Sequence, residues 1–236
     1  MTEVGVPVQV KRLRIGRDGI QVRLTLSDDS EYTLHIDAVT TLGLRVEAPV
    51  NEGLRAKLED HQTRYRAREA ALRLLAVRPR SRRELQDRLR RKEIPAGIIR
   101  DVLDRLVELR LLNDADFARA LVRDRLRLRP KGRRALSAEL ARKGVAREVS
   151  DEVMDEIFAE METSEAEVAD RVAAGWLKRQ PSKTRTALFE GPRSEAGAKA
   201  WRRGLGHLAR KGFGGGLART ALDRALKDRA ALDSSL

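Results

Sequence analysis

Residues 78–92 read RPRSRRELQDRLRRK, and residues 129–143 read RPKGRRALSAELARK. The second stretch repeats the first at a displacement of 51 residues, and the same displacement gives 13 identities between residues 65–106 and 116–157. Self-similarity at a fixed period is typical of proteins built from stacked copies of one small unit. The repeat therefore decides the fold class before any single element is assigned.

A third copy follows at a changed spacing. Pro79 and Pro130 are continued by Pro181 at the same displacement of 51, but the string ARKG at residues 141–144 returns at 209–212, displaced by 68. The difference of 17 residues predicts an insertion in the third copy, near residues 182–199, where the sequence is loop-like.

Each copy is predicted to form three short helices. In the first copy, apolar residues at helical spacing over 67–75 form one face, and Pro79 ends that helix. Ser81 with Glu84 forms a predicted capping box for the second helix, and Pro95 opens the third. In the second copy, Gly144 predicts that the middle helix ends in a left-handed turn. In the third copy, Ser164 and Glu167 predict a second capping box.

The first sixty residues differ from the repeats. Apolar and polar residues alternate over 6–15, 20–26 and 31–36, the period of half-buried strands, and a short helix is expected near 37–44. Gly43, Pro49 and Gly53 predict a link to the helical part. We expect a mainly α fold, with tandem three-helix repeats in an elongated curved array and a small N-terminal antiparallel β segment. The predicted domains are residues 1–62, 63–112, 113–162 and 163–236.

Charge is distributed unevenly along the chain of 236 residues, which carries a net charge of +13. Residues 1–63 have a net charge of −2, residues 64–147 of +15, residues 148–167 of −9 and residues 168–236 of +9. Such segregation produces local fields stronger than the average charge implies. Two basic blocks around an acidic stretch therefore indicate a polyanionic partner.

The sequence contains few of the residues and motifs on which enzyme catalysis usually depends. The chain has no cysteine and three histidines, and it lacks the common nucleotide-binding, metalloprotease and serine-hydrolase motifs. We expect no catalytic residue, no metal site and no cofactor. No apolar run approaches the ~20 residues of a membrane span, and the N-terminus lacks a signal-peptide core, so the expected location is the cytoplasm.

The basic middle helices of the repeats are the candidate functional surface, because repeated Arg and Lys at one structural position could follow a phosphate backbone. A solubilising face, with arginines paired to Glu84, Asp87 or Glu139, is the competing interpretation. The candidate contact residues are Arg82, Arg83, Arg90, Arg91 and Lys92, then Arg133, Arg134, Arg142 and Lys143, then Arg202, Arg203, Arg210 and Lys211.

These motifs resemble the bacterial RecX family, the regulators of the RecA recombinase. The resemblance rests on ALRLLAVRPRSRRELQDRL at 71–89, LNDADFA at 112–118, GRRALSAELARKGV at 132–145 and RKGF at 210–213. It extends over about residues 64–226. Two departures stand out: Glu93 replaces the glycine common after the first middle helix, and the third copy carries the insertion.

The resemblance implies an inhibitor of the RecA–single-stranded DNA filament. Members of the family are understood to lie in the filament groove and to hinder ATP hydrolysis, strand exchange and coprotease activity, which places the protein in DNA recombination, repair and the SOS response. The expected partners are the RecA filament and single-stranded or double-stranded DNA, contacted through phosphates by a monomer, with no membrane partner. Residues 148–167 would contact a basic protein surface or the chain's own arginines.

Two other classes of function compete with this one. Three-helix units resemble helix-turn-helix folds, so the chain could be a module that binds DNA directly. Its middle helices offer Arg but almost no Asn or Gln for reading bases, with Gln86 as the only such candidate, so we expect binding to be salt-sensitive and indifferent to sequence. A structural scaffold for another protein is the third class, and only the family motifs argue against it.

Overall fold

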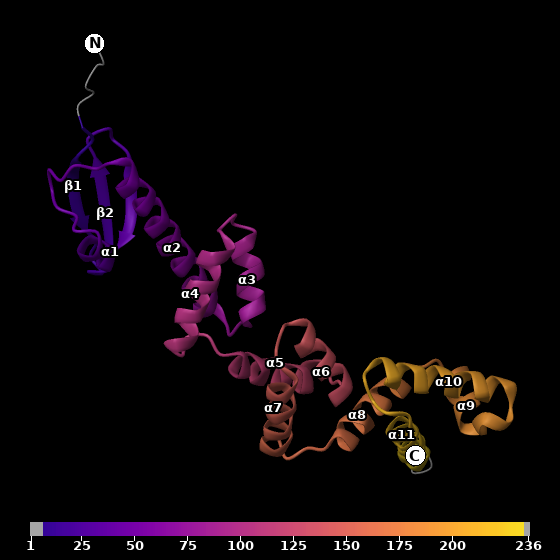
Figure 1. The fold of residues 1–236 in the computed structure, drawn as a ribbon. Helices are drawn as coiled ribbons and strands as arrows, with labels where there is room; N and C mark the ends of the chain where they lie inside the picture. The colour runs from indigo at the N-terminus through magenta and orange to yellow at the C-terminus, as the bar shows by residue number, and fades with distance from the viewer. Residues whose placement is uncertain (1–6, 234–236) are drawn as a thin grey trace. The chain divides into compact units, whose positions relative to one another are not determined.

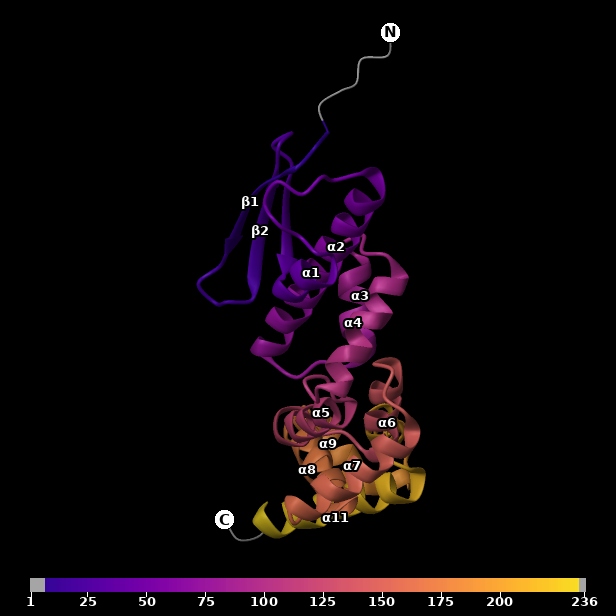
Figure 2. The same ribbon diagram turned by 60° about the vertical axis from the view of Figure 1, so that its left-hand side comes forward.

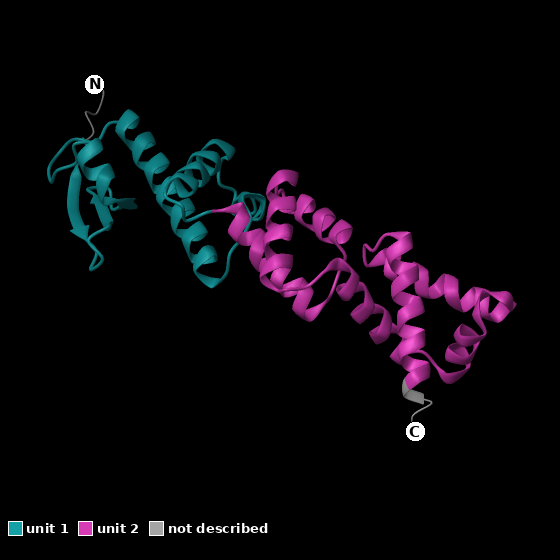
Figure 3. Ribbon diagram, turned by 90° about the horizontal axis from the view of Figure 1, so that it is seen from below, with its two compact units in different colours: residues 1–112 teal, residues 113–236 magenta. Residues whose placement is uncertain are grey.

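The structure is a computed structural model that describes residues 7–233. It divides into two compact units, residues 1–112 and 113–236, each of which is described separately (Figure 3). The described residues form a three-stranded sheet, eleven α-helices and one 3-10 helix. This composition confirms the predicted mainly α class with tandem three-helix repeats and a small N-terminal sheet.

The sheet of unit 1 is antiparallel, with the strand order β1-β2-β3. Its strands are β1 (Val10–Ile15), β2 (Gln21–Leu26) and β3 (Glu31–His35), and the short helix α1 (Ile36–Thr41) follows. The strand predicted over 6–15 thus begins at Val10, while Val6 lies outside the described residues. The side chains of Leu24, Leu26 and Leu34 are fully buried and form the centre of the sheet's core.

Helix α2 (Glu52–Val77) connects this sheet to the first repeat without a break. The Asn51 side chain caps it by accepting a hydrogen bond from the Leu54 N–H at 2.8 Å, so the predicted link at Gly53 is wrong and the residue lies in the first turn. The first half of α2 lies against the sheet (Figures 1 and 2). Leu58 belongs to the sheet core and Ala71 to the core of the first repeat, so α2 serves both.

Helices α3 (Arg82–Arg90) and α4 (Ala96–Glu108) complete the first repeat. The Ser81 hydroxyl accepts the Glu84 N–H at 3.1 Å, as the predicted cap requires. The Glu84 carboxylate, however, pairs with Arg78 at 2.7 Å and Arg80 at 2.6 Å. The reciprocal half of that capping box is therefore replaced by ion pairs, whereas the box of Ser164 and Glu167 is complete.

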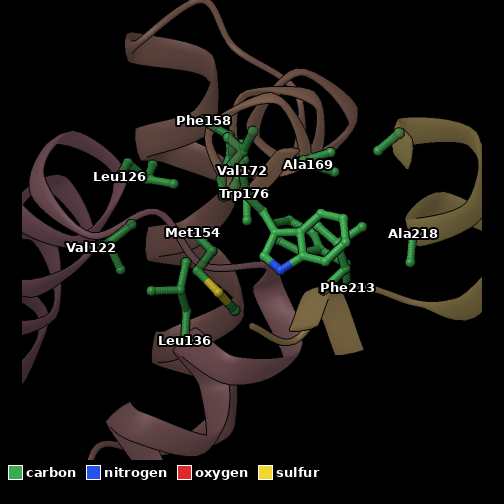
Figure 4. Close-up of a cluster of buried hydrophobic side chains, with 14 of the residues drawn as sticks. Val122, Leu126, Leu136, Met154, Phe158, Ala169, Val172, Trp176, Phe213 and Ala218 are labelled. Atoms are coloured by element: carbon green, nitrogen blue, oxygen red, sulfur yellow. The ribbon is translucent and has the colours of Figure 1, made fainter. Parts of the chain in front are cut away.

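Unit 2 is helical throughout its described residues. Its helices are α5 (Asp114–Leu128), α6 (Arg133–Arg142), α7 (Arg147–Glu160), α8 (Glu165–Lys178), α9 (Ser182–Glu190), the 3-10 helix η1 (Gly191–Arg193), α10 (Glu195–Arg210) and α11 (Gly215–Asp233). One continuous core joins the second and third repeats, with Met154, Trp176 and Phe213 close together (Figure 4). Packing of these two repeats in series is what their small individual cores require.

The inserted segment of the third repeat is helical, and its prediction as a loop is wrong. Residues 182–199 form α9, η1 and the start of α10. The Ser194 hydroxyl caps α10 by accepting the Gly197 N–H at 3.0 Å. Leu188 is buried, and its carbonyl accepts a hydrogen bond from Trp201 Nε1 at 3.2 Å. Capping and burial of one leucine thus order a segment whose Gly and Pro content favoured a loop.

The middle helices α3, α6 and α10 end in the same left-handed turn. Gly144 has a φ of +83°, which confirms its predicted role, and Gly212 has a φ of +94°. Glu93 occupies the equivalent place in the first repeat with a φ of +60°. A residue with a Cβ pays about 1–2 kcal/mol for this conformation, so the first repeat carries local strain that the others avoid.

Replacing Glu93 by glycine is therefore expected to stabilise unit 1. The gain should be about 1 kcal/mol, because relief of the left-handed strain exceeds the extra flexibility of glycine in the unfolded chain. Urea unfolding of the variant and the wild type would measure it. Gly144→Ala is the matched control and should lower stability, and a loss of stability in Glu93→Gly would contradict this explanation.

Candidate functional site

The middle helices of the second and third repeats meet end to end. At the junction, the Gly132 N–H at the start of α6 donates to the Lys211 carbonyl at the end of α10, at 2.9 Å. A Cβ on Gly132 would lie 2.7 Å from the Gly212 carbonyl oxygen, and one on Gly212 would lie 2.5 Å from the Ala135 nitrogen. The two backbones approach this closely because both positions are glycine.

This α6–α10 junction brings together candidate residues that lie far apart in the sequence. Arg133 and Arg134 begin α6 on one side, while Arg210 and Lys211 end α10 on the other. Among the described residues, ion pairs are absent from a set of exposed or half-buried cations on these two helices. That set is Arg134, Arg142, Lys143, Arg202, Arg203, Arg210 and Lys211.

The first arginine of the middle helix forms an internal ion pair in repeats one and two. Arg82 pairs with Asp104 at 2.7 Å, and Arg133 pairs with Asp155 at 2.5 Å. Arg82 and Arg133 are 51 residues apart, and so are Asp104 and Asp155. Each of the two repeats therefore contains the same ion pair between its second and third helices. The Arg133 guanidinium also lies 4.6 Å from the ring centroid of Phe158. These two arginines are engaged within their own repeats.

The third repeat departs from that pattern. At its displacement of 68 residues, Trp201 aligns with Arg133, Arg202 with Arg134 and Arg203 with Ala135. The positions that stay basic in all three copies are therefore the second arginine and the final Arg-Lys pair. They are Arg83, Arg134 and Arg202, then Arg91, Arg142 and Arg210, then Lys92, Lys143 and Lys211.

The first repeat presents its basic residues separately, within unit 1. Arg83, Arg91 and Lys92 are exposed and form no ion pair with described residues. Arg90 is also exposed and lies 3.9 Å from Asp87, at the outer limit of an ion pair. The competing interpretation was that acidic residues of the same chain neutralise the middle-helix arginines. In the first repeat it describes Arg82 and Arg90, but not Arg83, Arg91 and Lys92.

Several acids of residues 148–167 are paired with arginines of the same unit. Glu156 receives both of its hydrogen bonds from Arg119 Nε at 3.0 Å, and Glu160 pairs with Arg123 at 2.5 Å. The Arg123 hydrogen bond lowers the pKa of Glu160. Of the two uses considered for this stretch, pairing with the chain's own arginines is thus observed, while Glu148 and Glu152 remain exposed.

Glu139 is a buried carboxylate on α6 whose partners differ from those expected. It pairs with Arg125 at 2.5 Å and Lys131 at 2.7 Å, and neither cation belongs to a middle helix. Burial raises the pKa of Glu139, but the hydrogen bonds from both cations outweigh it and lower the pKa to about 2. The charged form of this carboxylate therefore stabilises unit 2.

Acid should weaken unit 2 through Glu139. A carboxyl whose pKa is depressed on folding contributes stability that is fully present above its unfolded pKa of 4.5 and is lost as the pH falls towards 2. We expect roughly 3 kcal/mol of unfolding free energy to disappear across that window. Urea unfolding of wild type and Glu139→Gln at several pH values would measure it. Parallel pH curves for the two proteins would contradict the assignment.

The described residues contain no group of three or more His, Asp and Glu side chains that could hold a metal ion. Over residues 7–233, no helix has the length and apolarity that crossing a membrane requires.

Comparison with known proteins places the repeats in a family. The models of the first and second three-helix domains of RecX match residues 67–106 and 113–154. The regulatory protein RecX of Mycolicibacterium smegmatis is 39% identical over 156 residues, covering 66% of this chain and 77% of that relative. The chain belongs to the RecX family. RecX of Corynebacterium efficiens is 38% identical over 184 residues, covering 75% and 83% of the two chains.

Solved RecX structures share the fold. One crystal structure of regulatory protein RecX superposes with a TM-score of 0.69 at 17% identity, covering 92% of this chain and 99% of that one. RecX from Lactobacillus salivarius gives a TM-score of 0.52 at 20% identity. The two matched RecX domains contain the basic positions of α3 and α6, whereas those of α10 and the N-terminal sheet lie outside both matches.

Proposed function

We propose that the protein is a non-catalytic regulator that binds the RecA–single-stranded DNA filament and inhibits its ATPase, strand-exchange and coprotease activities. It acts as a monomer in the cytoplasm, in recombination, repair and the SOS response. Membership of the RecX family supports the regulatory role, and the surface of the repeats supports the mode of binding.

The observation that carries the proposal is the three-fold recurrence of exposed, unpaired cations. Arg134, Arg142, Arg202 and Arg210 are exposed on α6 and α10 and form no ion pair with described residues. Each phosphate that such a side chain neutralises releases condensed counterions, which drives binding without reading sequence. The α6–α10 junction joins the two sets within one unit, so a single phosphate-rich strand can contact both.

The partner protein would be recognised by a different surface of unit 2. Glu148 and Glu152 are exposed on α7, one turn apart, and form no ion pair with described residues. Acidic side chains on one helix and basic side chains on others suit a filament in which protein and phosphate alternate. We assign these two glutamates to a basic patch on RecA.

Binding to three targets tests the proposal. The chain has no cysteine, so Ser182→Cys, at the exposed start of α9, gives a single site for a fluorescent label. The labelled protein should bind RecA-coated single-stranded DNA more tightly than bare DNA of the same length or RecA alone. Equal affinity for bare and coated DNA would contradict filament recognition.

Direct DNA binding remains the second candidate function, and the exposed arginines favour it as a component. In that case bare DNA would be the tightest target, inhibition of RecA would require coating of the strand, and affinity would fall steeply with salt. A sequence preference that persists at raised salt would contradict both candidates, because both rest on phosphate contacts, which carry no sequence information.

A further inference from the structure

The N-terminal sheet has an outer face that the proposed function does not use. Val22, Leu24 and Leu26 of β2 are buried, so the residues between them face the opposite side of the sheet. In the observed register Arg14 is the partner of Arg23, and Arg12 lies two residues along β1 from Arg14. We call these three arginines (Arg12, Arg14 and Arg23) the sheet patch.

Arg14 and Arg23 lie directly opposite each other, which is a costly arrangement for a sheet. Directly opposed like charges on neighbouring strands are destabilising, since their Cβ atoms are only ~5 Å apart. All three arginines of the sheet patch are exposed, and they form no ion pair with described residues. Repulsion of this kind is relieved when an anion binds between the guanidinium groups.

The acids near the sheet patch do not relieve this repulsion. Asp28 is bound to Arg55 at 2.5 Å, and Asp29 to Lys11 at 2.7 Å. Glu31 lies on the same outer face, beside Thr25 and diagonal to Arg23, and it too forms no ion pair with described residues. Within residues 7–233, the three neighbouring cations of the sheet patch are thus left without an ion pair.

The chemistry of the surrounding face indicates which anion fits. Besides the sheet patch, its outward positions in β2 and β3 hold Gln21, Thr25, Glu31, Thr33 and His35. None of these is a Phe, Tyr, Trp or aliphatic side chain, whereas the centres of protein interfaces are rich in such residues. A surface of guanidinium, hydroxyl and amide groups instead matches a chain of phosphates.

We propose that the sheet patch binds the phosphate backbone of single-stranded nucleic acid, independently of the middle helices. A flexible strand can place consecutive phosphates on arginines that lie within ~7 Å of one another along and across the sheet. A duplex is stiff and holds its two backbones on either side of its grooves, so it matches such a compact cluster less well. The arginines contact phosphates, which carry no sequence information, so binding is indifferent to sequence.

The experiment compares the full-length protein with Arg12→Gln/Arg14→Gln/Arg23→Gln. Fluorescence anisotropy with a labelled oligothymidylate, without RecA, gives the affinity at several salt concentrations. Loss of three phosphate contacts should reduce the slope of log affinity against log salt by about 2. Because the substitutions remove like-charge repulsion, the melting temperature should stay unchanged or rise, which separates lost binding from lost folding.

The matched control is Arg45→Gln/Lys57→Gln/Lys183→Gln, which removes the same charge from three exposed positions that belong neither to the sheet patch nor to the middle helices and form no ion pair with described residues. Its slope should stay close to that of the wild type. An unchanged slope in the sheet variant, or an equal reduction in the control, would overturn the proposal, and a larger reduction on duplex than on single-stranded DNA would overturn the choice of a single strand. Inhibition of RecA does not enter this assay, so its outcome is distinguishable from failure of the proposed function.

Discussion

Replacing Arg134, Arg142, Arg202 and Arg210 by glutamate is expected to raise the concentration needed for half-inhibition of the RecA ATPase by about 100-fold. The four side chains are exposed and form no ion pair with described residues, so their reversal breaks no ion pair among the described residues of unit 2. Each reversal replaces attraction to a phosphate by repulsion. The ATPase of RecA on single-stranded DNA, measured against protein concentration, gives the shift.

A charge-matched control variant and a check of folding show whether the loss of inhibition is specific to these four arginines. Glutamates at Arg45, Lys57, Lys183 and Arg193, four other exposed cations without ion pairs to described residues, give the same change in net charge and should shift half-inhibition only a few-fold. Circular dichroism should show both variants folded. Inhibition that survives reversal of the α6 and α10 arginines would contradict their assignment to the filament or its DNA.

Gly212→Ala is expected to destabilise unit 2 by about 2–4 kcal/mol. The new methyl group would need a left-handed backbone at a φ of +94°, and it would lie 2.5 Å from the Ala135 nitrogen and closer still to the Ala135 Cβ. Left-handed strain accounts for about 1–2 kcal/mol and overpacking for about 1–3 kcal/mol. Urea unfolding would measure the loss.

The same substitution should also weaken inhibition of RecA, because it forces the ends of α6 and α10 apart and separates their basic residues. Gly214→Ala is the matched control, since an added methyl group there meets nothing within 4 Å, and it should behave like the wild type. If Gly212→Ala kept full stability, the close backbone approach at the α6–α10 junction would be wrong.

Sequence repetition was sufficient to predict the helices of the repeats outside the insertion, because their determinants are local. Proline stops, serine caps and the helical spacing of leucines depend on neighbouring residues. The left-handed turn at Gly144 likewise follows from residue type alone. The RecX resemblance, which rested on the motifs of the repeat, is confirmed by the two matching RecX domain models and by the RecX relatives.

What the sequence did not predict depends on contacts between distant residues. Gly53 lies inside helix α2, whose Leu58 is buried against the sheet, and the insertion is helical because Leu188 is buried. Contacts between distant residues also decide which candidate arginines form ion pairs and which are exposed. Arg133 pairs with Asp155 across two helices, and no local pattern distinguishes it from Arg134, which is exposed.

The proposed regulatory role is tested most directly by titrating the wild-type protein into RecA that is hydrolysing ATP on single-stranded DNA. If the protein acts on the filament through the surfaces of its repeats, inhibition should be complete at well below one protein per RecA subunit, because one chain would block several subunits. Inhibition that appears only when the protein is sufficient to coat the DNA, and that disappears when excess DNA is added, would contradict it.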